Sequence, residues 1–416
     1  MKFEIDSRNV SEGDIFIAIK GEKNNGHDFV NEAFKKGAQS AIVEEKRDYI
    51  KDVILVDNVI DYINQQASNI IKNSKIRIGI TGSNGKTTTK FFLFHLLSYG
   101  FNVFTTEKNY NTEIGIPVSI LNNYNNQPVS ILEMGLRKEN DLEYLSKYYN
   151  PNISIILNIG TSHIEFFKNR KNIAKEKLKI ISHAEKPGLI FINGDEPLLD
   201  VEYPKDMKVF RFGETKNNDG YLIDYEYYNG NTRVYYHIYG ESLMLTLSGI
   251  WNKGQLLDAL VSLMISLYFE IPIDPFYISS FKLPEKRFDF KKFNNSVVIN
   301  DAYNASRESF FAAFETIKKM NVKEKKILIM GEMLELGENS YNYHLDVLEK
   351  AKDVFDEIYF YDPNNKYNFE KLDFINILNK TDEIIKVLNS QYSYIYVKGS
   401  NGTNLWKIVE DTIKGG

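Results

Sequence analysis

Residues 76–90, IRIGITGSNGKTTTK, place an apolar run before two glycines, a lysine and several hydroxyl side chains. Gly82 and Gly85 allow backbone N–H groups to turn toward phosphate oxygens, and Lys86 can neutralise the charge of the β- and γ-phosphates. The Thr87 hydroxyl can bind Mg²⁺, and a helix that begins here directs its positive end at the same phosphates. We therefore expect an ATP-binding loop that includes Gly82, Ser83, Asn84, Gly85, Lys86, Thr87 and Thr88.

This loop departs from the strict phosphate-binding motif at one position. The pattern G-x-x-x-x-G-K-[ST] has a glycine where this chain has Ile80. A chance glycine-rich turn is the alternative interpretation, but the apolar run before the turn and the helix after it favour a nucleotide site. The shorter form TGSNGKTT is less typical of motors and GTPase switches.

Two further apolar runs end in polar residues of the kind that a metal site needs. Residues 129–132 lead to Glu133, and residues 153–159 lead to Thr161 and His163. In an open parallel sheet, ligands bind at the carboxyl ends of the strands. A hydroxyl, a carboxylate and an imidazole that converge on bound phosphates would form a Mg²⁺ site. Taken singly, the carboxylate could belong to a salt bridge and the histidine could cap a helix; together they favour the metal site.

The predicted helix 172–181 carries a lysine on its apolar side. On a helical wheel, Lys177 falls in the middle of an apolar arc, whereas Lys175, Glu176 and Lys179 fall on the opposite face. A lysine that points inward needs a partner or a lowered pKa, because an unpaired buried cation is costly. An ammonium group that reaches back to the surface is an equally open alternative.

Composition limits the classes of protein to consider. The 416 residues suffice for two or three domains, and 43% hydrophobic with 26% charged residues is ordinary for a globular protein. The net charge of −5 gives no basic field for nucleic acid, so no nucleic-acid partner is expected. The absence of cysteine excludes disulfides, thiolate metal sites and cysteine nucleophiles. No signal peptide or membrane span is expected, and a cytoplasmic location follows.

Alternating strand and helix patterns divide the chain into three α/β units. We expect an N-terminal domain over residues 1–75, a central ATP-binding domain with a parallel sheet over 76–284, and a C-terminal Rossmann-like domain over 285–416. Within the central domain, residues 221–246 alternate as antiparallel strands, and a helix is expected from Asn252 to Tyr268. The phosphate-binding loop and the polar strand ends all lie in this central domain.

Several segments together resemble the Mur ligase family, most closely its MurF type. The segment DSRNVSEGDIFIAIKGEKNNGHDF is similar to the uridine-nucleotide domain that MurE and MurF share. NYNTEIGIP, LEMGLRKENDLEYLSKYYNPNISIILNIGTSHIEFF and NGDEPLL resemble MurF in the central region. DAYNASRESF, GEMLELGE and VKGS do so in the last one. The resemblance therefore extends over nearly the whole chain.

The resemblance implies roles for individual residues. Thr87, Glu133 and His163 match metal ligands, and Lys177 matches a lysine that the family carbamoylates with CO₂, which would turn a cation into an anion able to hold Mg²⁺. The remaining matched positions are polar residues near the γ-phosphate and the sugar peptide (Asn111, Thr112), residues that receive adenine and ribose (Asn252, Arg287, Asp301, Asn304) and the uridine-nucleotide pocket (Ser7, Arg8, His27).

Four positions depart from the family pattern. Trp251 replaces a histidine and Gln255 replaces an asparagine in the segment that resembles G-x-H-N-x-x-N. Glu332 stands where an aspartate is usual, and Asn401 where arginine is usual. A flat Trp251 ring could stack on a nucleotide base, and Gln255 retains an amide.

The resemblance implies an ATP-dependent amide-bond ligase with Mg²⁺ as cofactor. A UDP-N-acetylmuramoyl-tripeptide would be activated as an acyl phosphate and joined to D-Ala-D-Ala, the last cytoplasmic step of peptidoglycan precursor synthesis. A monomer whose last domain closes over ATP is expected. Three alternatives stay open: a MurE-type ligase that adds one amino acid, a folylpolyglutamate synthase, which lacks the N-terminal domain expected here, and a nucleotide-binding partner protein without catalysis.

Overall fold

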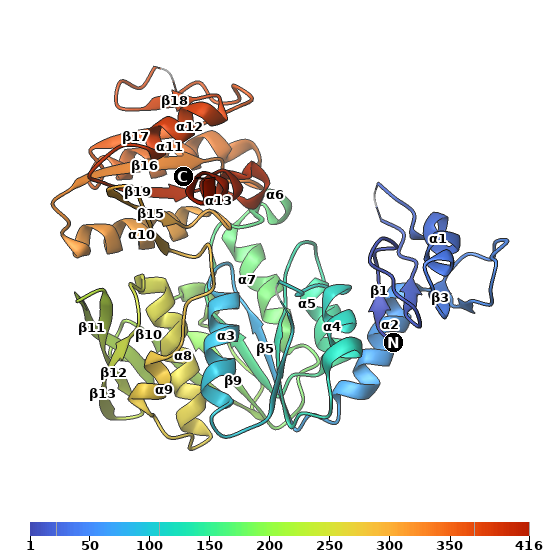
Figure 1. The fold of residues 1–416 in the computed structure, drawn as a ribbon. Helices are drawn as coiled ribbons and strands as arrows, with labels where there is room; N and C mark the ends of the chain where they lie inside the picture. Colours follow the sequence, from blue (N-terminus) through green and yellow to red (C-terminus); the bar gives the residue numbers. More distant parts are fainter. Residues whose placement is uncertain (22, 108, 370, 416) are drawn as a thin grey trace.

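The chain folds into three β-sheets flanked by helices (Figure 1). This computed structural model describes residues 1–21, 23–107, 109–369 and 371–415. We name three parts after their sheets: the N-terminal unit (3–71), the central unit (76–279) and the C-terminal unit (289–415). The predicted α/β class with three domains is confirmed. The domain boundaries after residues 75 and 284 stay predictions.

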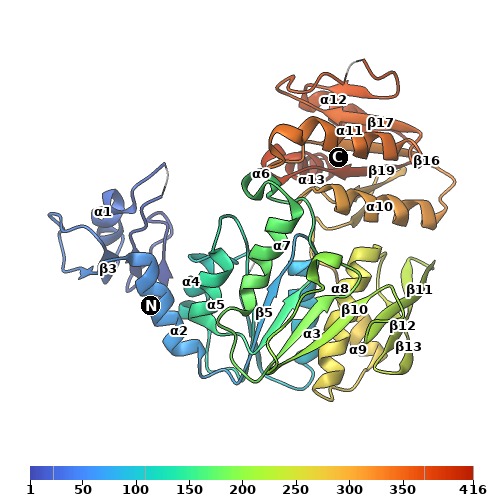
Figure 2. The same ribbon diagram turned by 180° about the vertical axis from the view of Figure 1, so that it is seen from behind.

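The N-terminal and C-terminal units lie on different sides of the central unit. Figure 1 and Figure 2 both show the C-terminal unit above one end of the central unit, while the N-terminal unit stands to one side. The N-terminal unit is connected to the central unit through the long helix α2 (Val59–Ile71). None of the helices in the described part of the chain is long and apolar enough to cross a membrane.

The N-terminal unit contains a four-stranded parallel sheet in the order β1-β2-β3-β4. Besides α2, its elements are β1 (Phe3–Glu4), β2 (Ile15–Ile17), the 3₁₀ helix η1 (Gly26–Phe29), α1 (Val30–Lys35), β3 (Ser40–Val43) and β4 (Ile54–Leu55). Sequence analysis missed β1, because a two-residue strand carries no alternating pattern. Ala67 and Ile71 of α2 lie in the hydrophobic core of the central unit, and they fix the two units together.

The central unit contains a nine-stranded sheet in the order β13-β12-β11-β10-β9-β8-β5-β7-β6. Its first part comprises β5 (Ile76–Thr81), α3 (Lys86–Leu97), β6 (Val103–Thr105), α4 (Gly115–Asn123), β7 (Val129–Glu133), α5 (Asp141–Tyr149), β8 (Ile153–Ile156), α6 (Ile164–Phe167), α7 (Arg170–Leu178), η2 (Lys179–Ile181), β9 (Gly188–Asn193), η3 (Pro197–Leu199) and β10 (Met207–Gly213). Strand β5 pairs in parallel with both β7 and β8. The three strand ends that carry the predicted site residues are therefore neighbours.

An antiparallel extension completes the central sheet. It comprises β11 (Gly220–Tyr228), β12 (Asn231–Ile238) and β13 (Glu241–Leu247), as the alternating pattern predicts. Helix α8 (Lys253–Tyr268) packs against α3, and α9 (Pro275–Ser279) follows it. Because α8 contacts the helix that begins at the phosphate-binding loop, its side chains can reach the same site.

The C-terminal unit contains a six-stranded sheet in the order β14-β15-β19-β16-β17-β18, parallel except for the β14–β15 pair. Its elements are β14 (Asp289–Phe293), β15 (Ser296–Asn300), α10 (Arg307–Met320), β16 (Lys325–Gly331), η4 (Gly337–Asn339), α11 (Ser340–Ala351), β17 (Glu357–Tyr361), β18 (Asn376–Leu378), α12 (Thr381–Leu388), β19 (Ser393–Lys398), η5 (Asn401–Thr403) and α13 (Leu405–Gly415). Short β18 and polar β14 were not expected from the sequence.

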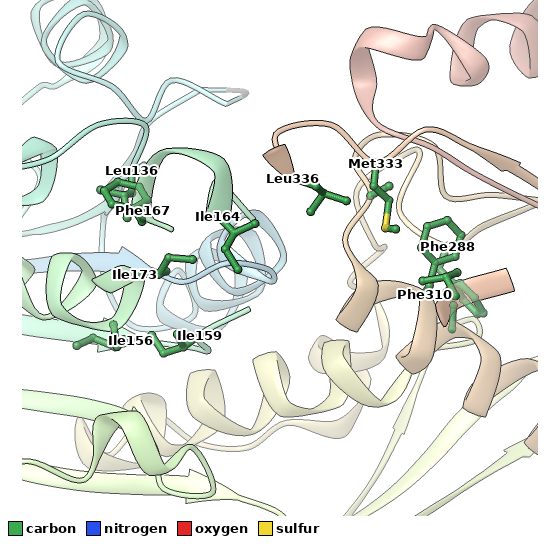
Figure 3. Close-up of a cluster of buried hydrophobic side chains, with 14 of the residues drawn as sticks. Leu136, Ile156, Ile159, Ile164, Phe167, Ile173, Phe288, Phe310, Met333 and Leu336 are labelled. Carbon is green, nitrogen blue, oxygen red and sulfur yellow. The ribbon is translucent and has the colours of Figure 1, made fainter. Parts of the chain in front are cut away.

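One hydrophobic cluster continues from the central unit into the C-terminal unit. Met333 and Leu336, in the loop after β16, belong to the same buried cluster as Ile164 of α6 and Ile173 of α7. Figure 3 shows Leu336 and Met333 on one side of this junction and Ile164 on the other. These apolar contacts hold the C-terminal unit over the carboxyl ends of the central strands.

Candidate active site

A cavity of about 520 Å³ lies between the central and C-terminal units. Its volume is in the range of small-molecule and cofactor sites. The central unit contributes the phosphate-binding loop, Glu133, His163 and the first turns of α8. The C-terminal unit contributes Asp301 and Asn304, and Arg287 comes from the segment just before it. Most of the predicted nucleotide and metal residues therefore face one shared space.

The phosphate-binding loop leaves backbone donors open at the start of α3. Gly85 has a φ of 87°, and α3 begins at the next residue without a side-chain cap. The first N–H groups of such a helix have no partner within the helix and can bind phosphate oxygens. Lys86 Nζ donates to the carbonyl oxygen of Gly82 at 2.7 Å. Burial lowers the pKa of Lys86, although the nearby Glu133 carboxylate opposes that shift.

Glu133 is the centre of a buried hydrogen-bond network at the end of β7. Its Oε2 accepts a hydrogen bond from the Thr87 hydroxyl at 3.0 Å, and its Oε1 accepts one from the Asn111 amide at 2.9 Å. Lys90 Nζ lies 3.5 Å from Oε2. Burial raises the pKa of Glu133, but attraction from Lys90 and Lys86 outweighs burial and places the pKa below its ordinary value. The carboxylate is therefore ionised and held beside the Thr87 hydroxyl.

Arg287, in the segment just before β14, brings a positive charge to the same hydroxyl. Its Nη2 donates to Thr87 Oγ1 at 3.1 Å, and its guanidinium lies 4.3 Å from the centre of the Tyr303 ring. Sequence analysis associated this arginine with adenine and ribose. Its contact with Thr87 places the guanidinium beside the phosphate-binding loop, and its role in nucleotide binding stays a prediction.

His163 lines the cavity from the residue before α6. Its backbone has a φ of 64°, and its Nδ1 contacts the carboxylate of Glu335 in the C-terminal unit. This contact lowers the pKa of Glu335. Because Nδ1 faces Glu335, Nε2 is the ring nitrogen that remains for a ligand.

Lys177 is buried, as the helical wheel indicates, and only 2% of its surface is exposed. No hydrogen-bond or ion-pair partner for its ammonium group is found among the residues that the structure describes. Burial, assisted by repulsion from Lys86, places the pKa of Lys177 well below its ordinary value. Lys175 is exposed as expected, whereas the prediction for Glu176 was wrong: it is buried, and its carboxylate binds the Asn140 N–H and the Lys179 ammonium group.

Asp301 and Asn304 line the cavity from the loop after β15. The Asp301 carboxylate accepts hydrogen bonds from Lys398 Nζ at 2.7 Å and from the Tyr396 hydroxyl at 2.8 Å. Lys398 Nζ also donates to the carbonyl oxygen of Asn304 at 3.0 Å. Sequence analysis did not select Lys398, although it ends an apolar strand just as Glu133 does.

At the start of α8, the structure agrees with the prediction for Asn252 and contradicts the one for Trp251. Asn252 lines the cavity as predicted, and with Gln255 it forms reciprocal hydrogen bonds that cap α8. The suggested stacking of Trp251 on a base was wrong. Its ring is fully buried against Phe92 and Phe281, and its Nε1 donates to a backbone carbonyl. From the sequence alone, a large aromatic ring before a helix cap could equally belong to the hydrophobic core or stack on a nucleotide base.

The predicted substrate residues lie in different places. Asn111 lines the cavity beside Glu133. Thr112 Oγ1 accepts hydrogen bonds from backbone N–H groups at the start of α4, so it serves the local fold. His27 is buried in the N-terminal unit, where Nδ1 contacts the Asn25 side chain and Nε2 accepts from the N–H of Glu44. The geometry therefore does not support a uridine contact by the His27 ring.

Ser7 and Arg8 also lie in the N-terminal unit, away from the cavity. Ser7 is buried, and Arg8 is exposed and paired with Asp6. The two other departures from the family pattern, Glu332 and Asn401, do not line the cavity either. The assignment of Ser7 and Arg8 to the uridine-nucleotide pocket stays a prediction.

One cavity residue that the sequence did not reveal is Asp258 of α8. Its carboxylate lies against Gly85, where any β-carbon would overlap it, and only 5% of the residue is exposed. Burial raises the pKa of Asp258 to about 7. An acidic residue inside an otherwise apolar helix was the available signal.

Comparisons with known proteins agree along the whole chain. Sequence models match for the Mur ligase family, catalytic domain (residues 3–78), the Mur ligase middle domain (80–257) and the Mur ligase, glutamate ligase domain (286–397). The UDP-N-acetylmuramoyl-tripeptide–D-alanyl-D-alanine ligase of Bacillus subtilis is 31% identical, over 98% of this chain and 92% of its own length. Its counterpart from Rickettsia prowazekii is 30% identical, over 98% of this chain and 94% of its own length.

A solved structure gives the same result. The MurF ligase from Thermotoga maritima, crystallised in complex with ADP, has a TM-score of 0.91 to this structure at 32% identity. The match covers 100% of this chain and 97% of that chain.

Proposed function

The chain belongs to the Mur ligase family, and we propose that it is the ATP-dependent ligase that joins D-Ala-D-Ala to a UDP-N-acetylmuramoyl-tripeptide. The products are the extended peptide, ADP and phosphate. One observation carries this proposal beyond family membership: the Thr87 hydroxyl is hydrogen-bonded both to Glu133 of the central unit and to Arg287, just before the C-terminal unit. That junction lies in the cavity beside open backbone donors.

The residues present fit a Mg²⁺ ion. Mg²⁺ prefers oxygen ligands and is commonly held by one or two carboxylates together with substrate phosphates. Thr87 Oγ1 and the ionised Glu133 carboxylate supply such oxygens, and His163 lines the same cavity. When bound, the ion would neutralise charge on the phosphate oxygens during transfer.

The reaction consists of two displacements. A carboxylate oxygen of the tripeptide attacks the γ-phosphorus of ATP, the bond to the bridging oxygen breaks, and ADP leaves. The dipeptide amine then attacks the carbonyl carbon of the acyl phosphate, phosphate leaves, and the amine loses a proton. Lys86, Arg287 and the N–H groups at the start of α3 hold the phosphates in line. Closure of the C-terminal unit excludes water from the acyl phosphate.

Lys177 is proposed to react with CO₂ to form a carbamate. Formation of a carbamate requires a neutral amine, and burial already shifts Lys177 toward that form. The product is an anion beside Lys86, so it would replace repulsion between two cations with attraction. Its role would be to orient the phosphates or the metal ion.

The N-terminal unit is proposed to hold the uridine nucleotide, and Asn111 to contact the sugar peptide. Asn252, Asp301 and Asn304, which line the cavity, are proposed to receive adenine and ribose. We place the reaction in the cytoplasm, where ATP and UDP-linked precursors are found, and expect the chain to act as a monomer.

Mass spectrometry of reaction mixtures tests this function. The enzyme is incubated with ATP, Mg²⁺ and a UDP-muramoyl tripeptide, and either D-Ala-D-Ala or a panel of single amino acids is added. The expected result is a product that carries both alanines, with phosphate release that needs both the tripeptide and the dipeptide. A product formed only with a single amino acid would favour a MurE-type ligase. Nucleotide binding without any product would favour a partner protein.

A further inference from the structure

We propose that Lys90 is a positioning residue for the metal site, because it contacts Glu133 and fixes the carboxylate oxygen that faces Thr87. This inference rests on the proposed function, in which Thr87 and Glu133 bind Mg²⁺. Lys90 itself lies in α3, one turn after the phosphate-binding loop. It is not among the residues that line the cavity, so it does not contact substrate.

The geometry around Lys90 is that of a buried counter-ion. None of its surface is exposed, and its Nζ donates to the carbonyl oxygen of Thr106 at 3.0 Å while it lies 3.5 Å from Glu133 Oε2. Nζ also lies 4.6 Å from the centre of the Phe91 ring. The lysine is therefore fixed from several sides, and its charge is directed at one carboxylate oxygen.

Glu133 needs such a partner because it is itself 2% exposed. A buried carboxylate is costly unless it is paired and hydrogen-bonded, so the groups that contact its two oxygens decide how it is oriented. With Lys90 in place, Oε2 receives both the ammonium group and the Thr87 hydroxyl hydrogen. The hydrogen of Thr87 is thereby directed inward, and its oxygen, which also accepts a hydrogen bond from Arg287, keeps a lone pair for a metal ion.

Lys86 and Arg287 cannot supply this charge throughout the reaction. Both line the cavity, and a bound triphosphate would attract both ammonium and guanidinium groups. Lys90 lies behind Glu133, outside the cavity, where phosphates do not reach it. It is the cation that stays with Glu133 when nucleotide is bound.

Calorimetric titration of ADP, once with Mg²⁺ and once with EDTA, tests this role without turnover. The ratio of the two affinities measures how well the site uses the metal. The variants are Lys90→Met, Lys90→Gln, Lys90→Arg, Glu133→Gln and the double variant Lys90→Met with Glu133→Gln. His95→Gln serves as control, since His95 lies on α3 and contacts Tyr277 instead of Glu133.

The expected result is a loss of about tenfold or more in this ratio for Lys90→Met and Lys90→Gln, while the affinity for ADP in EDTA changes by about twofold at most. Lys90→Arg, which keeps the charge, should retain most of the ratio, and His95→Gln all of it. Adding Lys90→Met to Glu133→Gln should lower the ratio no further, because the lysine acts through the carboxylate.

Two outcomes overturn the inference while the ligase function stands: a folded Lys90→Met or Lys90→Gln enzyme with an undiminished ratio, or additive losses in the double variant. If Lys90→Met does not fold, Lys90→Gln and the charge-neutral double variant decide. A wild-type ratio of one, with or without product formation, overturns the metal site itself and Lys90 with it.

Discussion

The Thr87 hydroxyl and the Glu133 carboxylate are joined by a hydrogen bond of 3.0 Å between the first turn of α3 and the end of β7. The contact exists because β5 and β7 are adjacent parallel strands, so that their carboxyl ends deliver both residues to one edge of the sheet. It joins the phosphate-binding loop to the carboxylate that we propose as a metal ligand.

Removal of either member of this pair should slow the ligase reaction. We expect Thr87→Val and Glu133→Gln each to lower the rate at saturating substrate by about 100-fold, because misplaced phosphates react poorly. The double variant should be little worse than either single one. Steady-state release of phosphate measures the effect, and Glu139→Gln, an exposed residue after β7, is the control. Additive losses would show that the two residues act separately.

Arg287 should strengthen the binding of ATP. A hydrogen bond to a charged group contributes roughly 1.5–3 kcal/mol, so Arg287→Ala should raise the KM for ATP by about tenfold or more. The KM for the dipeptide should change less. Lys292→Ala removes a charge from the exposed side of β14 and should leave both values unchanged. An unaltered KM for ATP in the arginine variant would contradict its assignment to the phosphates.

The free energy of unfolding should depend on pH because the pKa of Asp258 differs between the native and unfolded states. Burial raises its pKa from 3.8 to about 7, so between these values the native state holds a proton that the unfolded state has lost. Its contribution to stability is complete below the unfolded pKa and is lost as the pH rises through 7. The unfolding free energy of wild type, relative to Asp258→Asn, should therefore fall by up to about 1.4 kcal/mol per pH unit as the pH rises between the two pKa values. It should level off above the native pKa of about 7.

Urea unfolding of both proteins at a series of pH values across this window checks the expectation. Asp373→Asn, at an exposed position, should stay parallel to wild type. Parallel curves for Asp258→Asn as well would mean that this carboxylate is ionised throughout the window.

Trp251 should matter for stability and not for the nucleotide base. Trp251→Ala should lower the unfolding free energy by about 3–5 kcal/mol, because it removes a buried ring that packs on Phe92 and Phe281. Trp251→Phe, which keeps an aromatic ring in the core, should bind ADP as wild type does. A large loss of ADP affinity in the folded phenylalanine variant would restore a role in base binding.

Lys177 should be needed for the reaction in its modified form. We expect Lys177→Met to lose about 100-fold or more of the activity, as removal of a positioned charged group does elsewhere. Wild type should lose activity in CO₂-depleted buffer and regain it with bicarbonate. Lys175→Met, on the exposed side of α7, should behave as wild type. Full activity of Lys177→Met would exclude the carbamate.

Sequence patterns predicted the features that depend on local structure and on the order of strands. The phosphate-binding loop was recognisable because its strand, glycines and helix are contiguous, and Glu133 because a strand end in a parallel sheet has a defined place. Lys177 could be placed inward from the period of its helix. These inferences need no knowledge of how distant elements pack.

The residues that escaped prediction depend on such packing. Asp258 reaches Gly85 only because α8 lies against α3, and Trp251 is buried by an aromatic cluster whose members come from α3 and from the segment after α9. Lys90 belongs to the recognised motif, yet its partner Glu133 lies on another strand. Contacts between elements far apart in the chain are what a single sequence does not record.

The fate of the peptide carboxylate oxygens tests the proposed chemistry most directly. The tripeptide is labelled with ¹⁸O in its terminal carboxylate, one turnover is run with ATP and D-Ala-D-Ala, and the released phosphate is analysed by mass spectrometry. Activation as an acyl phosphate predicts that each phosphate carries one oxygen from the peptide. Phosphate without the label, formed together with the extended peptide, would contradict that activation.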